Sequence, residues 1–333
     1  MAETIGAGGT GAVDLPVPPG ATGEASWCQS PHFECERHRR AALAAIHAGR
    51  LPLKFAYAGS AAHTHDAYAA TDDYLSMLAS ARHEAEALLA ARALTAGALA
   101  VAEIGPGNGK RSSAFLSRLT SLGHPCRRYL ALDFSATLLA IACHRLAHFA
   151  NGQMSVDSHV WDIESGASES VERWRPGPEP VVVCLLGHTL GNLECPSAAL
   201  ANIRASLRPH DVLVLSVVVG RPDEPEATVL SPYRCPEFRD AALEPLRAAG
   251  LPEVDLDFVL RWRDGVVTGE AVLRRPGVLD GTEVPAGHRI RCFQSRRFNY
   301  PDVIAAVREA GWLIRNAVLA PGSHHLVITA SRG

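Results

Sequence analysis

The sequence lacks several features that would assign it to a class at once. It has no apolar run near the ~20 residues that a membrane span needs, and no basic region followed by an apolar stretch at its start. Lys and Arg number 32 against 35 Asp and Glu, a formal net charge of -3, so no basic surface is expected to hold a nucleic acid. We therefore expect a cytoplasmic protein without membrane or nucleic-acid partners.

The eight cysteines also lack a pattern. They are scattered, with no CxxC pair and no Cys/His cluster at metal-ligand spacing. Reduced thiols are then the expected state, and neither a metal site nor a disulfide framework is predicted. The remaining composition, 47% hydrophobic and 20% charged residues in a chain of 333, is that of an ordinary globular protein. This length fits one large domain or two of ordinary size, as a monomer or a homodimer.

The middle of the chain alternates short apolar strands with helices. This alternation predicts an α/β fold with a parallel, Rossmann-like sheet and right-handed crossovers. It is assigned to residues 81–220 and 300–333. The predicted strands are 99–104, 128–132, 158–163, 180–186, 211–219, 312–318 and 325–330, and the predicted helices are 111–122, 135–149, 197–207 and 300–311.

The other segments predict a tail and a second domain. Residues 1–25 are rich in Gly, Ala, Pro and Thr and are expected to be a disordered tail. Residues 26–80 are expected to form the N-terminal helices of a substrate or lid region, and residues 221–299 an inserted α+β substrate domain. The predicted elements are a helix at 35–48, a loop at 51–60, a helix from Asp72 to about 93, a Pro-rich loop at 221–232, a helix at 237–249 and antiparallel strands at 256–262, 266–274 and 288–297.

The strongest local signal is a glycine turn at the end of the first predicted strand. It reads Glu-Ile-Gly-Pro-Gly-Asn-Gly-Lys over residues 103–110, and its glycines let the backbone approach a ligand beside free helix N–H groups. Nicotinamide and flavin cofactors bind to similar turns, so the acidic residues at the neighbouring strand ends are needed to distinguish between the cofactors. Glu103 suits an ammonium group or orients the loop, Asp133 suits ribose hydroxyls, and Asp162 suits an adenine amine.

Acids at three successive strand ends favour S-adenosylmethionine over NAD. The residues expected to bind this cofactor here are Glu103, Gly105, Gly107, Lys110, Asp133, Phe134, Asp162 and Ile163.

A second glycine motif follows the fourth predicted strand. It reads Leu-Leu-Gly-His-Thr-Leu-Gly-Asn-Leu over residues 185–193, at the edge where open α/β sheets bind ligands. Gly187 allows the backbone to come close to the cofactor sulfonium. Asn192 offers an amide donor and a carbonyl acceptor, which suits an α-amino or α-carboxylate group. His188 is either a base or a loop histidine held by packing.

With these motifs the sequence resembles the histidine-specific N-methyltransferases, which carry a GSTIGN-type stretch where this chain has its second glycine motif. The resemblance runs from about residue 51 to 327 and is strongest in the two glycine motifs. It implies that Tyr57 and Tyr233 are substrate tyrosines, that Tyr68 covers the cofactor, and that Ser295 lies in the substrate site. It also implies a discontinuous substrate domain, built from the N-terminal helices and residues 221–299.

One position departs from the resemblance. The family carries a glutamate that reads the imidazole, and Phe293 stands there in this sequence. A phenyl ring cannot pair with an imidazole N–H, so histidine is not expected to be the preferred acceptor. The candidate catalytic and substrate residues are therefore Tyr57, His188, Asn192, Tyr233, Phe293 and Ser295.

Three functions fit these residues. The first is methyl transfer to the amine of an amino-acid-like small molecule, as in the biosynthesis of natural products. The second is a cyclase, in which the α-amine of S-adenosylmethionine attacks its own γ-carbon, releasing methylthioadenosine and forming azetidine-2-carboxylate. The aromatic residues expected around the sulfonium favour this alternative. The third is a non-catalytic regulator that binds S-adenosylmethionine.

Overall fold

The computed structural model describes residues 32–69, 81–92, 99–175, 177–220, 224–320 and 324–332. The tail predicted at 1–25 and the helix start predicted at Asp72 lie outside these ranges. Residues 31–333 form one compact unit. Within the described residues, no helix combines the length and apolar character that a membrane crossing requires.

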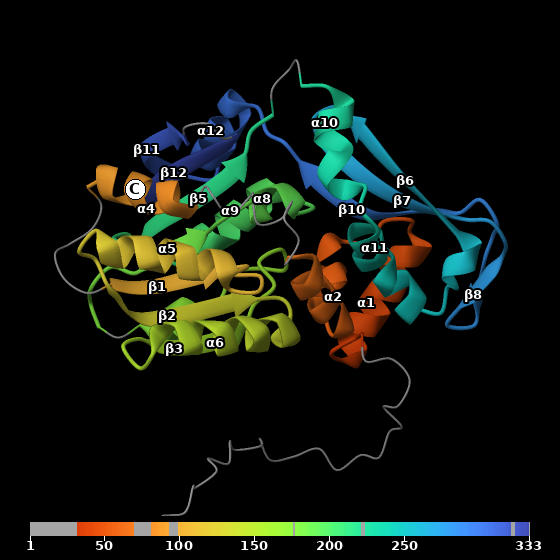
Figure 1. The fold of residues 1–333 in the computed structure, drawn as a ribbon, viewed down its shortest axis with the longest axis horizontal. Helices are drawn as coiled ribbons and strands as arrows, with labels where there is room; N and C mark the ends of the chain where they lie inside the picture. Colours follow the sequence, from red (N-terminus) through yellow and green to blue (C-terminus); the bar gives the residue numbers. More distant parts are fainter. Residues whose placement is uncertain are drawn as a thin grey trace, which may run out of the picture. The chain divides into compact units, whose positions relative to one another are not determined.

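A seven-stranded sheet carries the Rossmann-like fold (Figure 1). Its strands are β1 (Leu99–Ile104), β2 (Cys126–Asp133), β3 (Ser155–Val160), β4 (Val182–Leu185), β5 (Val212–Val218), β11 (Trp312–Leu319) and β12 (His325–Arg332). Their order is β11-β12-β5-β4-β1-β2-β3, and all of them run in the same direction except β12, which is antiparallel to both β11 and β5. The order reverses between β1 and β4, and ligands bind at such a reversal at the carboxyl ends of the strands.

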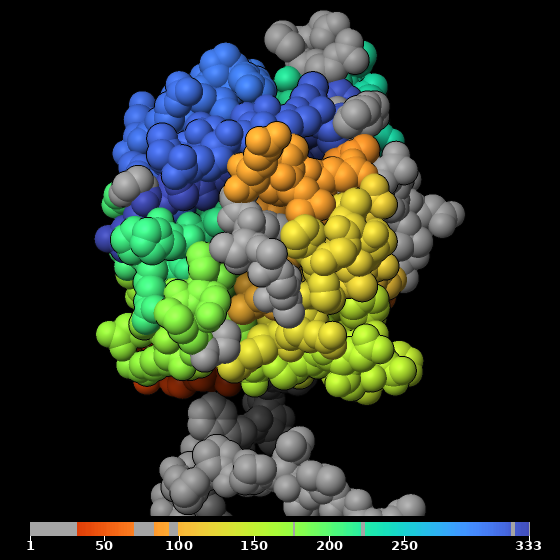
Figure 2. Space-filling model, turned by 90° about the vertical axis from the view of Figure 1, so that its left-hand side faces the viewer, coloured from red at the N-terminus to blue at the C-terminus, as the bar shows by residue number. Residues whose placement is uncertain are grey.

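Helices cover both faces of this sheet and bury two apolar clusters. On one face lie α9 (Pro196–Ala205) and α12 (Tyr300–Glu309), with the short helix α7 (Ser170–Trp174). On the other lie α4 (Ala81–Ala90), α5 (Lys110–Ser121) and α6 (Ala136–Ala150). Strand β4 is buried along its whole length, which explains its apolar sequence. Figure 2 shows α4, in orange, on the surface beside α5 and the blue C-terminal strands.

The remaining elements join two stretches far apart in the sequence. Leu43, Ile46 and Phe55 from the N-terminal stretch share one buried cluster with Leu246 and Ile290. The N-terminal elements are α1 (Glu36–His47), η1 (Leu53–Tyr57) and α2 (Ser60–Tyr68). Their partners are α10 (Glu226–Leu230), η3 (Ser231–Tyr233), α11 (Pro236–Ala248), η4 (Glu253–Asp255), the hairpin of β8 (Gly277–Leu279) and β9 (Thr282–Val284), and an antiparallel sheet of β6 (Leu256–Arg263), β7 (Val266–Leu273) and β10 (Arg289–Arg296).

This shared cluster is the packing that a discontinuous substrate domain would have, and α1, α2 and α11 lie side by side in Figure 1. The domain boundaries themselves stay a prediction.

Several predicted elements were wrong in type or extent. The loop predicted at 51–60 contains η1 and leads into α2, whose small alanines bury against α11. The Pro-rich loop predicted at 221–232 contains α10 and part of η3, because Val229 and Leu230 are buried. The third strand ends at Val160 rather than at 163, since the chain then turns at 162–165, where Ser165 donates its N–H to the Asp162 carbonyl, 3.0 Å away. Helix α4 ends at Ala90 rather than near 93.

Glu34, just before α1, ties the N-terminal stretch to the sheet. Its carboxylate accepts hydrogen bonds at the start of α6 from Ser135 Oγ (2.6 Å) and from the N–H groups of Ala136 and Thr137, both 2.9 Å away. It also accepts the N–H of Gly59 at 3.2 Å. An acid at a helix N-terminus satisfies free N–H groups and the helix dipole. Glu34 therefore caps α6 from a distant part of the chain, in addition to the local N-cap that Ser135 provides.

Replacing Glu34 with alanine should lower the free energy of unfolding by about 1–2 kcal/mol, because several N–H groups of α6 and its surroundings lose their acceptor. Chemical denaturation measures this. Glu36→Ala is the matched control: Glu36 forms only surface pairs with Arg39 and Arg40, so its loss should leave the midpoint nearly unchanged. Equal effects of the two substitutions would contradict the capping role.

Candidate active site

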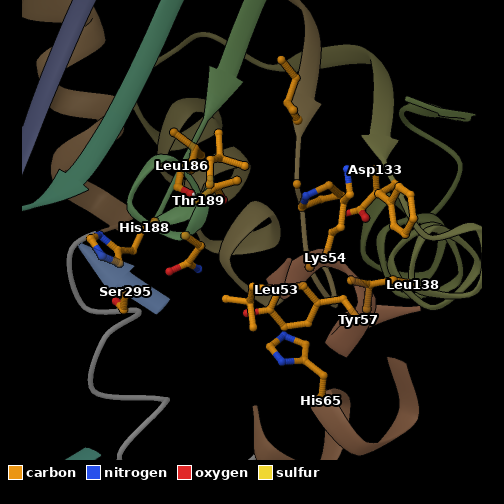
Figure 3. A pocket seen from close by; sticks show the side chains of 18 of the residues that line it. Leu53, Lys54, Tyr57, His65, Asp133, Leu138, Leu186, His188, Thr189 and Ser295 are labelled. Atoms are coloured by element: carbon orange, nitrogen blue, oxygen red, sulfur yellow. Dashed lines mark hydrogen bonds between the residues drawn. The ribbon is translucent and has the colours of Figure 1, made fainter. Parts of the chain in front are cut away.

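A cavity of about 300 Å³ lies where the strand order reverses. Its wall comes from both parts of the structure. Figure 3 shows Lys54, Tyr57 and His65 from the N-terminal stretch facing Leu186 and Thr189, which follow β4. A pocket of this size, apolar with a few polar groups, is typical of a small-molecule site.

The glycine turn after β1 forms one wall of the cavity. Gly105 and Gly107 both have left-handed backbone, with φ of 68° and 57°. A Cβ at Gly105 would lie 3.0 Å from Thr189 Cγ2, so a side chain there would press on the loop after β4. Gly187, in the second glycine motif, also has positive φ, 80°, and donates its N–H to Ser216 Oγ at 2.7 Å. These glycines leave open backbone that a ligand can approach closely.

Glu103 lies at the bottom of this wall and is almost fully buried. Its Oε2 accepts the hydroxyl of Tyr129 on β2, at 2.7 Å. Burial raises the pKa of Glu103 to about 7, which the hydrogen bond from Tyr129 partly opposes. This contact fixes the carboxylate of Glu103 against β2, and the two roles that the sequence left open stay a prediction.

Asp133 ends β2, and Phe134 follows it, at another side of the cavity. The Asp133 Oδ1 accepts the N–H of Ser135 at 3.0 Å. Burial, and to a lesser degree the nearby charge of Glu34, raise the pKa of Asp133 to about 7. The ring of Phe134 stacks on His38 of α1, with 4.3 Å between ring centroids. The N-terminal stretch therefore packs directly against the residues expected to hold the cofactor ribose and adenine.

Asp162 is paired with a lysine that sequence reasoning missed. Lys54 Nζ lies 2.7 Å from Asp162 Oδ2 and 3.5 Å from Glu164 Oε2, and 5.2 Å from the centroid of the Phe134 ring. Asp162 itself lies in a turn beyond β3, where its Oδ1 accepts the N–H of Glu164. No sequence pattern distinguished Lys54, because it follows no strand and belongs to no motif.

Arg111, rather than the predicted Lys110, reaches the cavity. Lys110 Nζ donates to the Ala69 carbonyl at 3.1 Å and is absent from the cavity wall. Arg111 lies in the wall and pairs with the fully buried Glu84 of α4 at 2.7 Å. The reason is helical geometry: the two residues open α5 and point about 100° apart, so only one can face the strand ends.

His188 is held in one tautomer. Its Nδ1 accepts the N–H of Val218 on β5 at 3.1 Å, so the proton of the neutral ring is on Nε2. Burial, followed by the positive charge of Arg297, lowers the pKa of His188 to about 3. The ring packs over Gly191, where a Cβ would lie 2.3 Å from it. This geometry favours the packing role over the base role.

Aromatic rings form the end of the cavity away from the sheet. Tyr233 of η3, Phe238 of α11 and Phe293 of β10 lie with ring centroids 4.7–5.1 Å apart. Tyr233 Oη is 3.1 Å from Ser295 Oγ, and Tyr68 donates to the Pro232 carbonyl at 3.4 Å. Phe238 was missed because a phenylalanine on an amphipathic helix gives only a packing signal.

The structure brings together every predicted site residue except Lys110. The cavity wall includes Tyr57, Tyr68, Glu103, Gly105, Gly107, Asp133, Phe134, Asp162, Ile163, Gly187, His188, Asn192, Tyr233, Phe293 and Ser295. Their roles stay a prediction. Sequence reasoning missed Lys54, His65, Arg111 and Phe238, which line the same cavity.

Comparison with known proteins identifies the family of this chain. The sequence-family model of the histidine-specific, S-adenosylmethionine-dependent methyltransferases matches residues 42–234. Similar solved structures include Streptomyces venezuelae DesVI (15% identity, 76% of this chain and 92% of that one, TM-score 0.40) and the S-adenosylmethionine-bound amino pentose methyltransferase CalS10 from Micromonospora echinaspora (17%, 77% and 92%, 0.39). No curated protein matches this chain in sequence.

The fold and the family match together define a Rossmann-like, S-adenosylmethionine-dependent methyltransferase. Within this class, the chain belongs to the histidine-specific, S-adenosylmethionine-dependent methyltransferase family.

The residues present fit S-adenosylmethionine. The left-handed glycines Gly105 and Gly107 form a cradle that side chains would fill, and Asp133 offers a carboxylate at the end of β2. Asp162 and Ile163 lie in the same wall. When bound, the cofactor supplies an activated methyl group, so the protein's own task is to bind and align the methyl acceptor.

Cofactor affinity should depend on pH through Asp133. Ribose hydroxyls would donate to the ionised carboxylate, so binding favours the deprotonated form. Because the pKa of Asp133 is raised to about 7, affinity should weaken as the pH falls below that value, by up to about tenfold per pH unit. Calorimetric titration of S-adenosylmethionine from about pH 8 to 6 measures this. Asp133→Asn should weaken cofactor binding and remove the dependence of affinity on pH. Glu103→Gln should leave the slope of affinity against pH unchanged. A flat wild-type profile would contradict the assignment.

His188 should stay neutral with Nδ1 unprotonated over the whole neutral range. Nitrogen NMR of histidine-labelled protein measures this, and His188→Asn identifies the signal by its disappearance. Since burial lowers its pKa to about 3, the ring should show no titration above about pH 5, unlike an ordinary histidine near 6.5. A ring that titrates between about pH 6 and 7 would restore the base role.

Proposed function

We propose that this protein methylates the amine of an amino-acid-like small molecule, an acceptor of the kind used in natural-product biosynthesis. The observation that carries the proposal is Asn192. Its side chain lines the cavity at the end of α8 (Thr189–Asn192), and among the described residues no protein group forms a hydrogen bond with its amide. A primary amide there can donate to a carboxylate and accept from an amine.

Hydroxyl groups across the cavity support an amino-acid backbone as the ligand. If Tyr233 donates to Ser295 Oγ, 3.1 Å away, the serine hydroxyl can pass a hydrogen bond to a ligand carboxylate. Tyr57 lies in the same wall, with its ring packed edge-on against His65 at 4.7 Å between centroids. These groups would orient the acceptor amine toward the glycine walls.

Alignment is then the main contribution of the protein. Holding two reactants in line can supply a large part of the rate enhancement without acid–base catalysis. The three histidines in the cavity wall are poor proton acceptors: burial lowers the pKa of His65 to about 4, and those of His188 and His325 to about 3. The proposed enzyme therefore binds the acceptor as a free amine and leaves its proton to solvent.

The cyclase is the second candidate, because aromatic rings enclose one end of the cavity and would stabilise a sulfonium there. It needs no acceptor. Incubation of the purified protein with S-adenosylmethionine alone separates the two. A methyltransferase should give almost no turnover until an amine is added. Methylthioadenosine in stoichiometric amounts, well above spontaneous decay, would overturn the proposal.

Asn192→Ala tests the role of the amide. We expect the KM for the acceptor to rise by about tenfold or more, since a buried ligand group loses its partner, while the Kd for S-adenosylmethionine stays nearly constant. Gln153→Ala is the control, because it removes a similar amide from an exposed position.

A loss of cofactor affinity equal to the rise in KM would place Asn192 at the cofactor instead, and would remove the main support for the proposal.

A further inference from the structure

The cavity has two chemically different halves. The carboxylates in its wall are Glu103, Asp133, Asp162 and Glu164, and all of them lie at or just after the carboxyl ends of β1, β2 and β3. In the described part of the chain, no carboxylate lines the other half. That half is an aromatic chamber, formed by Leu53, Tyr57, Tyr68, Tyr233, Phe238 and Phe293.

The rings of the aromatic chamber are fixed by their packing. Phe293 and Phe238 are nearly perpendicular, at 88°, and both are about 95% buried. Phe258 supports them from behind, with its ring 6.2 Å from that of Phe238. Gly269 on β7 makes room for this support, since a Cβ there would lie 2.7 Å from the Phe258 ring and 3.0 Å from Phe293 Cβ. The wall therefore presents ring surface that cannot easily turn away.

Three polar side chains at the chamber already have protein partners. Tyr68 donates to the Pro232 carbonyl, and Tyr233 is paired with Ser295. Arg297 lies in the cavity wall but forms an ion pair with Glu224 at 2.9 Å, and both side chains are at most 12% exposed. A charged group entering the chamber would lose its hydration and find no opposite charge left to pair with.

We propose that the aromatic chamber binds the side chain of the acceptor, and that the acceptor is an α-amino acid whose side chain is uncharged and apolar, either aromatic or branched aliphatic. This inference rests on the proposed function, in which Asn192 and Ser295 hold the amino-acid backbone. An apolar side chain gains from leaving water, and a ring can also pack edge-on against Phe293 and Tyr233.

Binding to the protein saturated with S-adenosylhomocysteine tests the chemistry of the chamber without turnover. The probes are L-phenylalanine, L-leucine, L-histidine, L-lysine and L-glutamate, titrated by calorimetry. We expect phenylalanine and leucine to bind at least about tenfold tighter than the other three, because only they avoid burying an unpaired polar or charged group. Methyl transfer from S-adenosylmethionine to the same panel should follow the same order.

Phe293 variants assign the preference to the chamber. Phe293→Leu keeps the wall apolar and should weaken phenylalanine binding more than leucine binding. Phe293→Glu should reverse the order toward lysine and histidine, by placing a carboxylate in the wall. Phe149→Leu is the control, since Phe149 is 42% exposed on α6 and outside the cavity, and it should leave the order unchanged. If the Phe293→Glu variant does not fold, the effect of Phe293→Leu on phenylalanine and leucine binding tests the assignment.

Two outcomes distinguish a failure of this inference from a failure of the proposed function. Methylation of lysine, glutamate or histidine at least as efficiently as of phenylalanine would overturn this inference and leave the proposed function standing. Absence of binding and methylation across the panel, with methylthioadenosine released from the cofactor alone, would overturn the proposed function and this inference with it.

Discussion

The attachment of the N-terminal stretch to the sheet is the constraint on which the cavity depends. Glu34 caps α6, and Lys54 reaches Asp162 beyond β3, so residues 32–68 are held over the carboxyl ends of the strands. With these contacts, a short segment supplies Tyr57 and Tyr68 to a site whose other walls come from the middle and the end of the chain.

Desolvation is the second physical theme of the site. Burial raises the pKa values of Glu103 and Asp133 to about 7, and lowers those of His65 and His188 to about 4 and 3. The histidines are therefore neutral in the closed cavity. In such a low-polarity space, hydrogen bonds and ion pairs to a ligand are strong, and unpaired polar groups are costly. The cavity is thus suited to selecting a ligand by the match of its polar groups.

Much of the fold followed from the sequence because the signals were local. Each local signal lies within a few residues and indicates its own structure. The signals are the apolar runs of β1, β4 and β5, the glycine turn beginning at Gly105 and the cap at Ser135. The errors occurred where tertiary packing overrode local pattern. The third strand was predicted to reach residue 163, but it ends at Val160, and Trp161 and Ile163 are buried beyond its end. Val229 and Leu230 form a helix because they pack against the inserted sheet.

The same division holds for the site. By itself the sequence determined the parallel sheet, the positions of the strand-end acids and the two glycine motifs, since strand ends and tight turns are marked by adjacent residues. Only the tertiary structure decided that Arg111 rather than Lys110 faces the cavity, that Lys54 pairs with Asp162, and that Phe238 joins Phe293. These contacts join residues up to 108 positions apart, and side-chain direction and long-range packing leave no mark in a local pattern.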